Sequence, residues 1–261
     1  MEGKVVKKSL FDLSGRTALI TGGGSGLGRD IAEAFAEYGA NIAVCSRKVA
    51  NCQETVDYLT SKYPIQAMAY ECDVSNEENV NGTVKAVLSD FGQVDILVNN
   101  SGATWGEKAE NMPLEAWQKV LNVNVTGTFL MSKAVGNHMI LNGYGKIINI
   151  GSVAGIRAES SKVLNAIGYS TSKAAVHHFT KDLARKWAEY GLYVNAIAPG
   201  FFETKMTKHV IDINGDEIKN NNPMKRIGDT DSLKGTALFL ASRASDYVTG
   251  QVIAVDGGSS L

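Results

Sequence analysis

Short apolar runs alternate with longer segments of helical periodicity along most of the chain, and this alternation restricts the fold more than any other feature. Seven runs rich in β-branched or aliphatic residues lie at 17–21, 41–45, 66–72, 95–99, 146–150, 192–197 and 251–255. Between the first six, apolar residues recur three and four positions apart, as at Ile31, Phe35 and Tyr38. Strands that are apolar on both faces and joined by helical crossovers form parallel sheets. The pattern therefore predicts an α/β fold, a doubly wound seven-stranded parallel sheet with helices on both faces.

The chain has 261 residues and no Gly/Ser/Pro-rich linker that would divide it. We expect an N-terminal extension over residues 1–10 and a single domain over 11–261. The longest stretch without clear periodicity is 201–229, which we expect to be irregular. Long irregular segments in compact domains are usually functional, so this stretch is predicted to act as a lid over the substrate.

The overall charge and the cysteine content exclude several classes of protein. The 26 basic and 27 acidic side chains give a formal charge of −1, which offers no general attraction to nucleic acid or to an anionic membrane. Cys45, Cys52 and Cys72 match neither zinc nor disulfide spacing, and no apolar run reaches transmembrane length. The four histidines form no ligand pattern and receive no role. These features predict a cytoplasmic protein that acts on a small molecule without a metal.

A glycine-rich turn, 22–28, follows the first predicted strand directly and precedes a helical segment. Glycines let the backbone approach a pyrophosphate closely, while the free N–H groups at the start of the helix face the anion. Taken alone, such a turn is equally compatible with a tight strand-to-helix connection. In this context it predicts a dinucleotide site, with contacts from Gly22, Gly24, Ser25, Gly26, Leu27 and Gly28.

The second predicted strand ends without the acidic residue that usually binds the 2′-hydroxyl of NAD. The sequence there is Cys45-Ser46-Arg47-Lys48. Because a guanidinium suits phosphate geometry, we expect Arg47 to bind the 2′-phosphate of NADP(H), with Ser46 and Lys48 adding donors. A solvated basic loop is the alternative.

Tyr169 and Lys173 lie four positions apart in a segment of helical period and would stack on one helix face. A free phenol ionises near pH ~10, and a neighbouring ammonium favours the phenolate, so Tyr169 is the predicted acid/base and Lys173 the residue that tunes it. Ser152 follows the fifth strand, where its hydroxyl can hold a substrate oxygen. Each of these residues also has an ordinary structural interpretation, for Ser152 that of a helix cap.

Several short motifs together make the chain resemble the short-chain dehydrogenase/reductase family. They are T-G-x-x-x-G-x-G at 21–28, N-N-S-G at 99–102, N-x-x-G at 124–127 in a disturbed helical stretch, Tyr169 with Lys173, Pro199-Gly200 with Thr204, and D-G-G at 256–258. The resemblance runs from about Phe11 to the C-terminus. It implies a Rossmann fold, an oxidoreductase that passes a hydride directly between NADP(H) and an alcohol or ketone carbon, and a homotetramer.

The resemblance also implies roles for individual residues. Asn124, Ser152, Tyr169 and Lys173 match the family's catalytic tetrad, in which the asparagine marks a helix distortion that holds a water. Further cofactor contacts are expected from Asp73, Val74, Asn100, Gly102, Tyr169, Lys173, Pro199, Gly200, Phe202 and Thr204. A non-catalytic dinucleotide-binding regulatory protein is the alternative of another class.

The substrate is less constrained than the chemistry. The stretch 99–106 and a lengthened interval of 17 positions between Ser152 and Tyr169 look closest to 3-oxoacyl-[acyl-carrier-protein] reductases, including those of rhamnolipid pathways. Gluconate 5-dehydrogenases and other sugar or polyol enzymes look nearly as similar. The extra residues in 156–168 are expected to select the substrate. Trp105 is a candidate wall residue, and Lys205, Lys208, Lys225 and Arg226 either meet an anionic acyl carrier or form a solvated lid face.

Overall fold

The computed structural model describes residues 9–161 and 163–261, and eight of the ten residues of the predicted N-terminal extension lie outside this part. Seven parallel strands form one sheet in the order β3-β2-β1-β4-β5-β6-β7. The strands are β1 Thr17–Thr21, β2 Asn41–Ser46, β3 Ala67–Glu71, β4 Ile96–Asn99, β5 Gly145–Ile150, β6 Leu192–Pro199 and β7 Val252–Val255. All seven predicted strands and the predicted doubly wound fold are confirmed.

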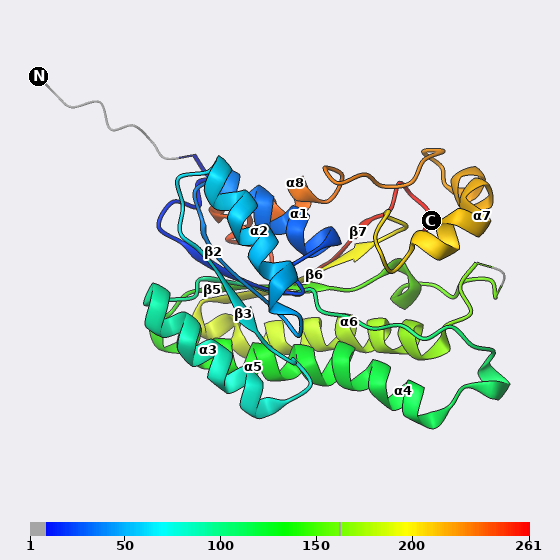
Figure 1. Ribbon diagram of the computed structural model, residues 1–261, viewed down its shortest axis with the longest axis horizontal. Coiled ribbons are helices and arrows are strands. Elements are labelled where there is room, and N and C mark those ends of the chain that lie inside the picture. Colours follow the sequence, from blue (N-terminus) through cyan, green and yellow to red (C-terminus); the bar gives the residue numbers. More distant parts are fainter. Residues whose placement is uncertain (1–8, 162) are drawn as a thin grey trace, which may run out of the picture.

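Helices cover both faces of this sheet (Figure 1). On one face lie α1 Gly26–Glu37, α2 Val49–Lys62 and α8 Lys234–Ala241, and on the other lie α3 Glu77–Phe91, α4 Leu114–Leu121, α5 Gly127–Asn142 and α6 Ile167–Trp187. Within β1, the side chains of Ala18 and Ile20 pack into the first layer and that of Leu19 into the second. This alternation explains why the strand is apolar at every position. Short 3-10 helices span Ala109–Asn111, Val153–Gly155, Ala188–Tyr190 and Arg243–Ser245.

The strand order changes direction between β1 and β4, because the chain adds β2 and β3 on one side of β1 and the remaining strands on the other. Loops that leave the carboxyl ends of β1 and β4 therefore diverge to opposite faces and leave a crevice between them. The carboxyl ends of β5 and β6 lie at the same edge, since all the strands are parallel. The topology thus brings the glycine turn, Ser152 and Pro199 to one edge of the sheet.

The irregularity predicted between two helical segments is present as a π-helix, Asn122–Thr126, between α4 and α5. Asparagine and glycine are weak helix formers, and π-bulges within longer helices often lie at functional sites. The wider turn carries Asn124, whose side chain is buried.

The predicted irregularity of 201–229 is wrong over half of its length, because this stretch contains helix α7, Lys208–Asn221. Only Ile218 of this helix is buried, so the helix needs only a narrow apolar stripe and shows little periodicity in the sequence. Helix α7 lies beyond the end of the sheet, close to the C-terminus (Figure 1).

Across residues 9–161 and 163–261, no helix combines the length and the hydrophobicity needed to span a bilayer.

The glycine turn leaves no room for a side chain at Gly28. A Cβ atom there would overlap Asn100 Nδ2 and lie 2.5 Å from the carbonyl oxygen of Gly22. We expect Gly28→Ala to lower the free energy of unfolding by about 1–3 kcal/mol, as overpacking does. Gly82→Ala in α3 is the matched control, because its Cβ would meet nothing within 4 Å and alanine favours the helix, so this variant should gain about 0.5–1 kcal/mol. Urea denaturation measures both, and equal stability of the two variants would contradict the packing argument.

Candidate active site

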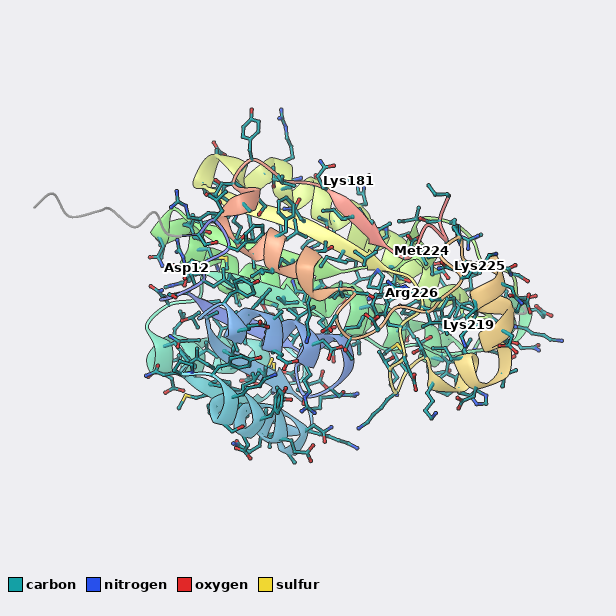
Figure 2. All side chains as sticks on the ribbon, turned by 90° about the horizontal axis from the view of Figure 1, so that it is seen from above. Asp12, Lys181, Lys219, Met224, Lys225 and Arg226 are labelled. Carbon is teal, nitrogen blue, oxygen red and sulfur yellow. The ribbon has the colours of Figure 1, made fainter. Side chains whose placement is uncertain are left out.

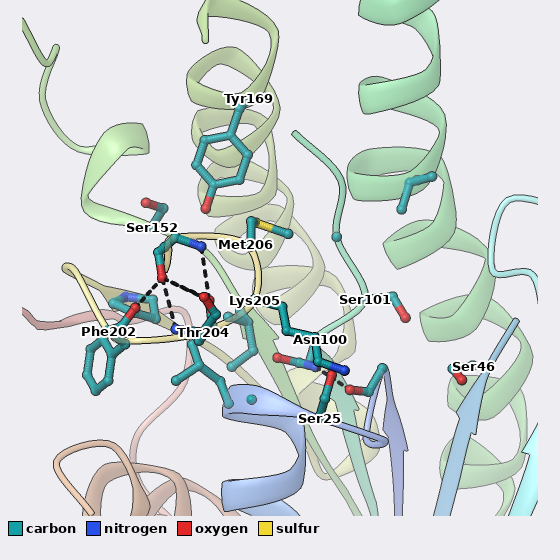
Figure 3. Close-up of a pocket in the computed structure, with 18 of the residues that line it drawn as sticks. Ser25, Ser46, Asn100, Ser101, Ser152, Tyr169, Phe202, Thr204, Lys205 and Met206 are labelled. Atoms are coloured by element: carbon teal, nitrogen blue, oxygen red, sulfur yellow. Dashed lines mark hydrogen bonds between the residues drawn. The ribbon is translucent and has the colours of Figure 1, made fainter. Parts of the chain in front are cut away.

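A cavity of about 350 Å³ opens at the carboxyl edge of the sheet and runs from the β2 end to α6 (Figure 3). Most of the predicted cofactor residues line it. They are Gly22, Ser25, Gly26, Leu27, Ser46, Arg47, Asp73, Val74, Asn100, Gly102, Tyr169, Lys173, Pro199, Gly200, Phe202 and Thr204. Residues more than 100 positions apart in the sequence thus converge on one cleft.

Asn100 holds the glycine turn in position. Its Nδ2 donates to the carbonyl oxygens of Thr21 at 3.0 Å and Gly22 at 3.2 Å, while its backbone N–H donates to Thr21 Oγ1 at 3.0 Å. Gly22 and Gly26 have positive φ angles of 66° and 53°, a backbone conformation that side chains disfavour. Contacts within the protein therefore fix the shape of the turn.

Three predicted cofactor residues do not line the cleft. A Cβ at Gly24 would lie 2.9 Å from the backbone of Asn51, so this glycine allows the turn to pack on α2, and Gly28 packs against Asn100 as described above. Lys48 points its side chain elsewhere, and its carbonyl oxygen accepts a hydrogen bond from Ser46 Oγ at 2.9 Å. Gly24 and Gly28 thus serve packing and do not line the cleft. The spacing of glycines in the sequence does not distinguish these two roles.

Arg47 lines the cleft at the end next to β2, and the residue is exposed. Asp73 faces the same space. Hydrogen bonds from Ser75 and the nearby positive charge of Arg47 hold the pKa of the Asp73 carboxyl below its usual value. Arg47 is the one cation at this end of the described cleft, so an additional phosphate there would meet it directly.

Ser152 and Tyr169 come together at the other end of the cleft. The Tyr169 side chain points its hydroxyl toward Ser152 (Figure 3). Burial raises the pKa of the Tyr169 phenol, and the nearby Ser152 side chain only partly opposes this. Tyr169 is therefore protonated at neutral pH.

Lys173 lies one helical turn beyond Tyr169 and is 5% exposed. Its Nζ donates to the carbonyl oxygen of Ile150 at 2.7 Å and lies 5.6 Å from the centre of the Tyr169 ring. Burial lowers the pKa of Lys173 to about 8. Burial thus acts on both groups, because desolvation disfavours the phenolate of Tyr169 and the ammonium of Lys173.

Asn124 has its side chain fully engaged away from the cleft. Its Oδ1 accepts from the N–H of Ala103 at 2.7 Å, and its Nδ2 donates to the oxygen of Ala103 at 2.9 Å and to Ser172 Oγ at 2.8 Å. The Ser172 hydroxyl donates in turn to the carbonyl oxygen of Tyr169 at 2.6 Å. Asn124 thus connects the loop after β4 to the first turns of α6.

The sequence interpretation missed several residues that line the cleft: Cys72, Ser101, Val123, Ile150, Gly151, Lys205, Met206 and Thr207. Each lies within two positions of a predicted residue or follows Thr204 within three positions. Proximity in the sequence was therefore the available signal, although it does not say which neighbours face inward.

A second cavity, of about 540 Å³, adjoins the first. Its walls come from the loop after β4, the lengthened segment before α6, and the region that begins α7. Val153, Ala154, Val163, Leu164, Ala166, Phe201, Met206 and Val210 give it a largely apolar lining, and Glu107, Lys108, Glu159 and His209 add polar groups. Ser152 and Tyr169 line both cavities. Trp105 lines neither and is 44% exposed.

The basic residues of the 201–229 stretch are exposed, and Lys205 among them also lines the first cavity. Lys219, Lys225 and Arg226 gather with Met224 at the end of the molecule beyond the sheet (Figure 2). Arg226 pairs with Asp229 at 3.4 Å and Lys208 with Asp212 at 3.3 Å. Because acidic side chains are interspersed among them, this surface is a mixed solvated face.

Among the described residues, no group of three or more His, Cys, Asp or Glu is placed to hold a metal ion.

Several known proteins are similar to this chain over nearly its whole length. A family model described as enoyl-(acyl carrier protein) reductase matches residues 22–260. A structure described as a short-chain type dehydrogenase/reductase from Mycobacterium marinum superposes with a TM-score of 0.92 at 36% identity, covering 96% of this chain and 97% of that one. The chain belongs to the short-chain dehydrogenase/reductase family. It is accordingly an oxidoreductase that acts on CH–OH and C=O groups.

Individual relatives of this dehydrogenase/reductase differ in the substrates their names state. The 2-dehydro-3-deoxy-D-gluconate 5-dehydrogenase of Bacillus subtilis (strain 168) is 43% identical over 253 residues, which cover 95% of this chain and 96% of the relative. The rhamnolipids biosynthesis 3-oxoacyl-[acyl-carrier-protein] reductase of Pseudomonas aeruginosa is 36% identical over 259 residues, covering 96% and 98%. A gluconate 5-dehydrogenase from Burkholderia cenocepacia J2315, solved with NADP and tartrate, superposes with a TM-score of 0.90 at 36% identity, covering 95% and 96%.

The pKa values of the buried pair predict how activity depends on pH. Ketone reduction needs the Tyr169 phenol protonated and benefits from a charged Lys173. Because the pKa of Lys173 is lowered to about 8, kcat/KM for reduction should be high from pH 6 to 7.5 and fall as the pH rises through about 8. Initial rates between pH 6 and 10, with cofactor affinity measured at each pH, test this. A flat profile up to pH 10 would show that Lys173 titrates outside this range.

Proposed function

We propose that this enzyme reduces a ketone with NADPH, using Tyr169 as the proton donor. The observation that carries the proposal is the position of Ser152 and Tyr169 at the junction of the two cavities. A carbonyl oxygen held there reaches both hydroxyls, while its carbon faces the cofactor cleft.

The residues of the cofactor cleft fit NADP(H). The glycine turn suits a pyrophosphate, Arg47 suits the 2′-phosphate, and we expect Lys173 to hold the nicotinamide ribose. The nicotinamide supplies the hydride when it is bound. Structures related to this chain that contain NADP support this cofactor.

The protein's own groups handle the proton and the developing charge. Ser152 Oγ and the Tyr169 hydroxyl donate hydrogen bonds to the substrate oxygen, where negative charge grows during reduction. Tyr169 then transfers its proton to that oxygen, and the Lys173 ammonium stabilises the resulting phenolate. The raised pKa of Tyr169 favours this direction at neutral pH, because the phenol is present as the acid. Asn124 positions α6 through Ser172 and touches no reacting atom.

For the substrate, we propose a 3-oxoacyl thioester. The support is the apolar lining of the second cavity, which accommodates an acyl chain beyond the Ser152–Tyr169 pair. The lengthened segment before α6 contributes Val163 and Leu164 to that lining. A sugar-acid dehydrogenase is the second candidate, favoured by the 43% identity to the Bacillus subtilis relative. The charge of the walls does not separate the two candidates, because Lys108 lies beside Glu107 and Glu159 is paired with Arg157 at 3.1 Å.

A substrate panel distinguishes the two candidates. Initial rates of NADPH oxidation should be measured with 3-oxoacyl thioesters of increasing chain length and with keto-sugar acids such as 5-ketogluconate. The apolar cavity predicts that kcat/KM rises about threefold or more for each added pair of methylene groups until the cavity is filled. Faster reduction of keto-sugar acids than of any thioester would overturn the acyl assignment and leave the reductase chemistry in place.

Arg47→Asp tests the assignment of the cofactor. Removing a charge-assisted contact to phosphate and adding a repulsive carboxylate should lower the NADPH/NADH ratio of kcat/KM by about 10- to 100-fold. Lys48→Asp, at the next position in the sequence, does not line the cleft, so it serves as the control for the change in local charge and should move the ratio much less. An unchanged ratio in Arg47→Asp would show that another group binds the 2′-phosphate.

We further propose that the enzyme acts in the cytoplasm as a homotetramer. Phe129 of α5 is 47% exposed and packs edge-to-face on Phe179 of α6, which gives these helices an apolar outer face suited to a second copy. Light scattering measures the assembly directly. The alternative of a non-catalytic binding protein is disfavoured because none of the acid/base residues or cleft glycines is replaced.

A further inference from the structure

His177 lies on α6 one turn beyond Lys173 and contacts the segment that carries Ser152. Its Nε2 is the hydrogen-bond partner of the Ser152 backbone N–H at 3.4 Å, and the ring is 7% exposed. The backbone of Gly155 bonds to the same imidazole. One side chain of α6 therefore spans the short 3-10 helix that begins just after Ser152.

The segment is shaped around the imidazole ring. A Cβ atom at Gly151 would overlap Nε2 and lie 2.6 Å from Cδ2. A Cβ at Gly155 would lie 2.6 Å from the backbone of Lys173 and Ala174 and 2.9 Å from Cε1 of His177. Glycine at 151 therefore makes room for the ring, and glycine at 155 lets the segment pack closely on both α6 and the ring.

The ring is neutral under working conditions. Burial lowers the pKa of His177 to about 4, and the nearby Lys173 acts in the same direction, while the hydrogen bond to Gly155 opposes them. A neutral imidazole has one donor and one acceptor nitrogen. Since Nε2 accepts from Ser152, the proton lies on Nδ1, which leaves the second hydrogen bond for the Gly155 backbone.

We propose that His177 is a positioning residue for the reaction, which fixes Ser152 relative to Tyr169 by joining the Ser152 backbone to the helix that carries Tyr169. The Ser152 hydroxyl also accepts from the N–H of Ala154 at 3.2 Å, so the 151–155 segment sets its direction. A shift of this segment would separate Ser152 from the substrate oxygen while leaving the glycine turn and Arg47 untouched. The inference rests on the proposed role of Ser152 and Tyr169, and it holds for any ketone the enzyme reduces.

Three variants test this role. His177→Leu removes the acceptor, His177→Gln restores an acceptor and a donor of similar reach, and His178→Leu is the matched control on the exposed side of the same helix. We expect His177→Leu to lower kcat by about 10- to 100-fold, because small misplacements of a reacting group are costly, with the Kd of NADPH changed less than about twofold. His177→Gln should recover kcat to within about threefold of the unmodified enzyme. The kcat of His178→Leu should equal that of the unmodified enzyme.

Hydrogen exchange of the peptide that contains residues 151–155 gives a readout independent of turnover. In His177→Leu the Ser152 amide should exchange about tenfold faster or more, and His178→Leu should leave it unchanged. If His177→Leu does not fold, Gly151→Ala decides the question, because its methyl group displaces the ring and should produce the same loss of kcat and of protection.

The proposal is overturned if folded His177→Leu or Gly151→Ala keeps kcat within threefold, if His177→Gln is no better than His177→Leu, or if exchange at 151–155 does not change. A failure of the 3-oxoacyl assignment alone looks different. In that case the unmodified enzyme reduces other ketones, and the exchange of the Ser152 amide still depends on His177.

Discussion

The hydrogen bond from Lys173 Nζ to the carbonyl oxygen of Ile150 is the interaction on which the rest of the site depends. It joins α6, which carries Tyr169, to the end of β5, which leads into Ser152. With all seven strands parallel, the same edge also receives the glycine turn and the loop after β6. A lysine can be buried here because the carbonyl replaces part of its lost hydration. Fixing this one contact aligns the acid, its serine partner and the cofactor cleft.

Burial has a chemical consequence that charge proximity alone does not predict. Burial in a dry pocket raises the pKa of Tyr169, so the phenol keeps its proton, and lowers the pKa of Lys173. A protonated phenol facing a carbonyl oxygen is ready to act as an acid. In the mechanism proposed above, reduction uses the phenol form of Tyr169, which burial favours at neutral pH.

Much of the architecture was predictable because it depends on local patterns. Strands apolar on both faces, a glycine turn and the four-residue spacing of Tyr169 and Lys173 are visible in the sequence and were found where expected. Other features depend on tertiary contacts. Helix α7 buries a single residue, Gly24 and Gly28 pack instead of lining the cleft, and the direction of the Tyr169 pKa shift is set by desolvation. His177 has no motif at all, because its partners are backbone atoms of a distant segment.

The central claim is that Tyr169 gives its proton to the substrate oxygen. Single-turnover oxidation of bound NADPH by Tyr169→Phe, with a ketone that the unmodified enzyme reduces, tests this most directly, because cofactor release does not contribute to the rate. The account predicts a loss of roughly 100- to 10,000-fold with the Kd of NADPH within about twofold of normal. A single-turnover rate within tenfold of the unmodified enzyme would contradict it and assign the proton to another group.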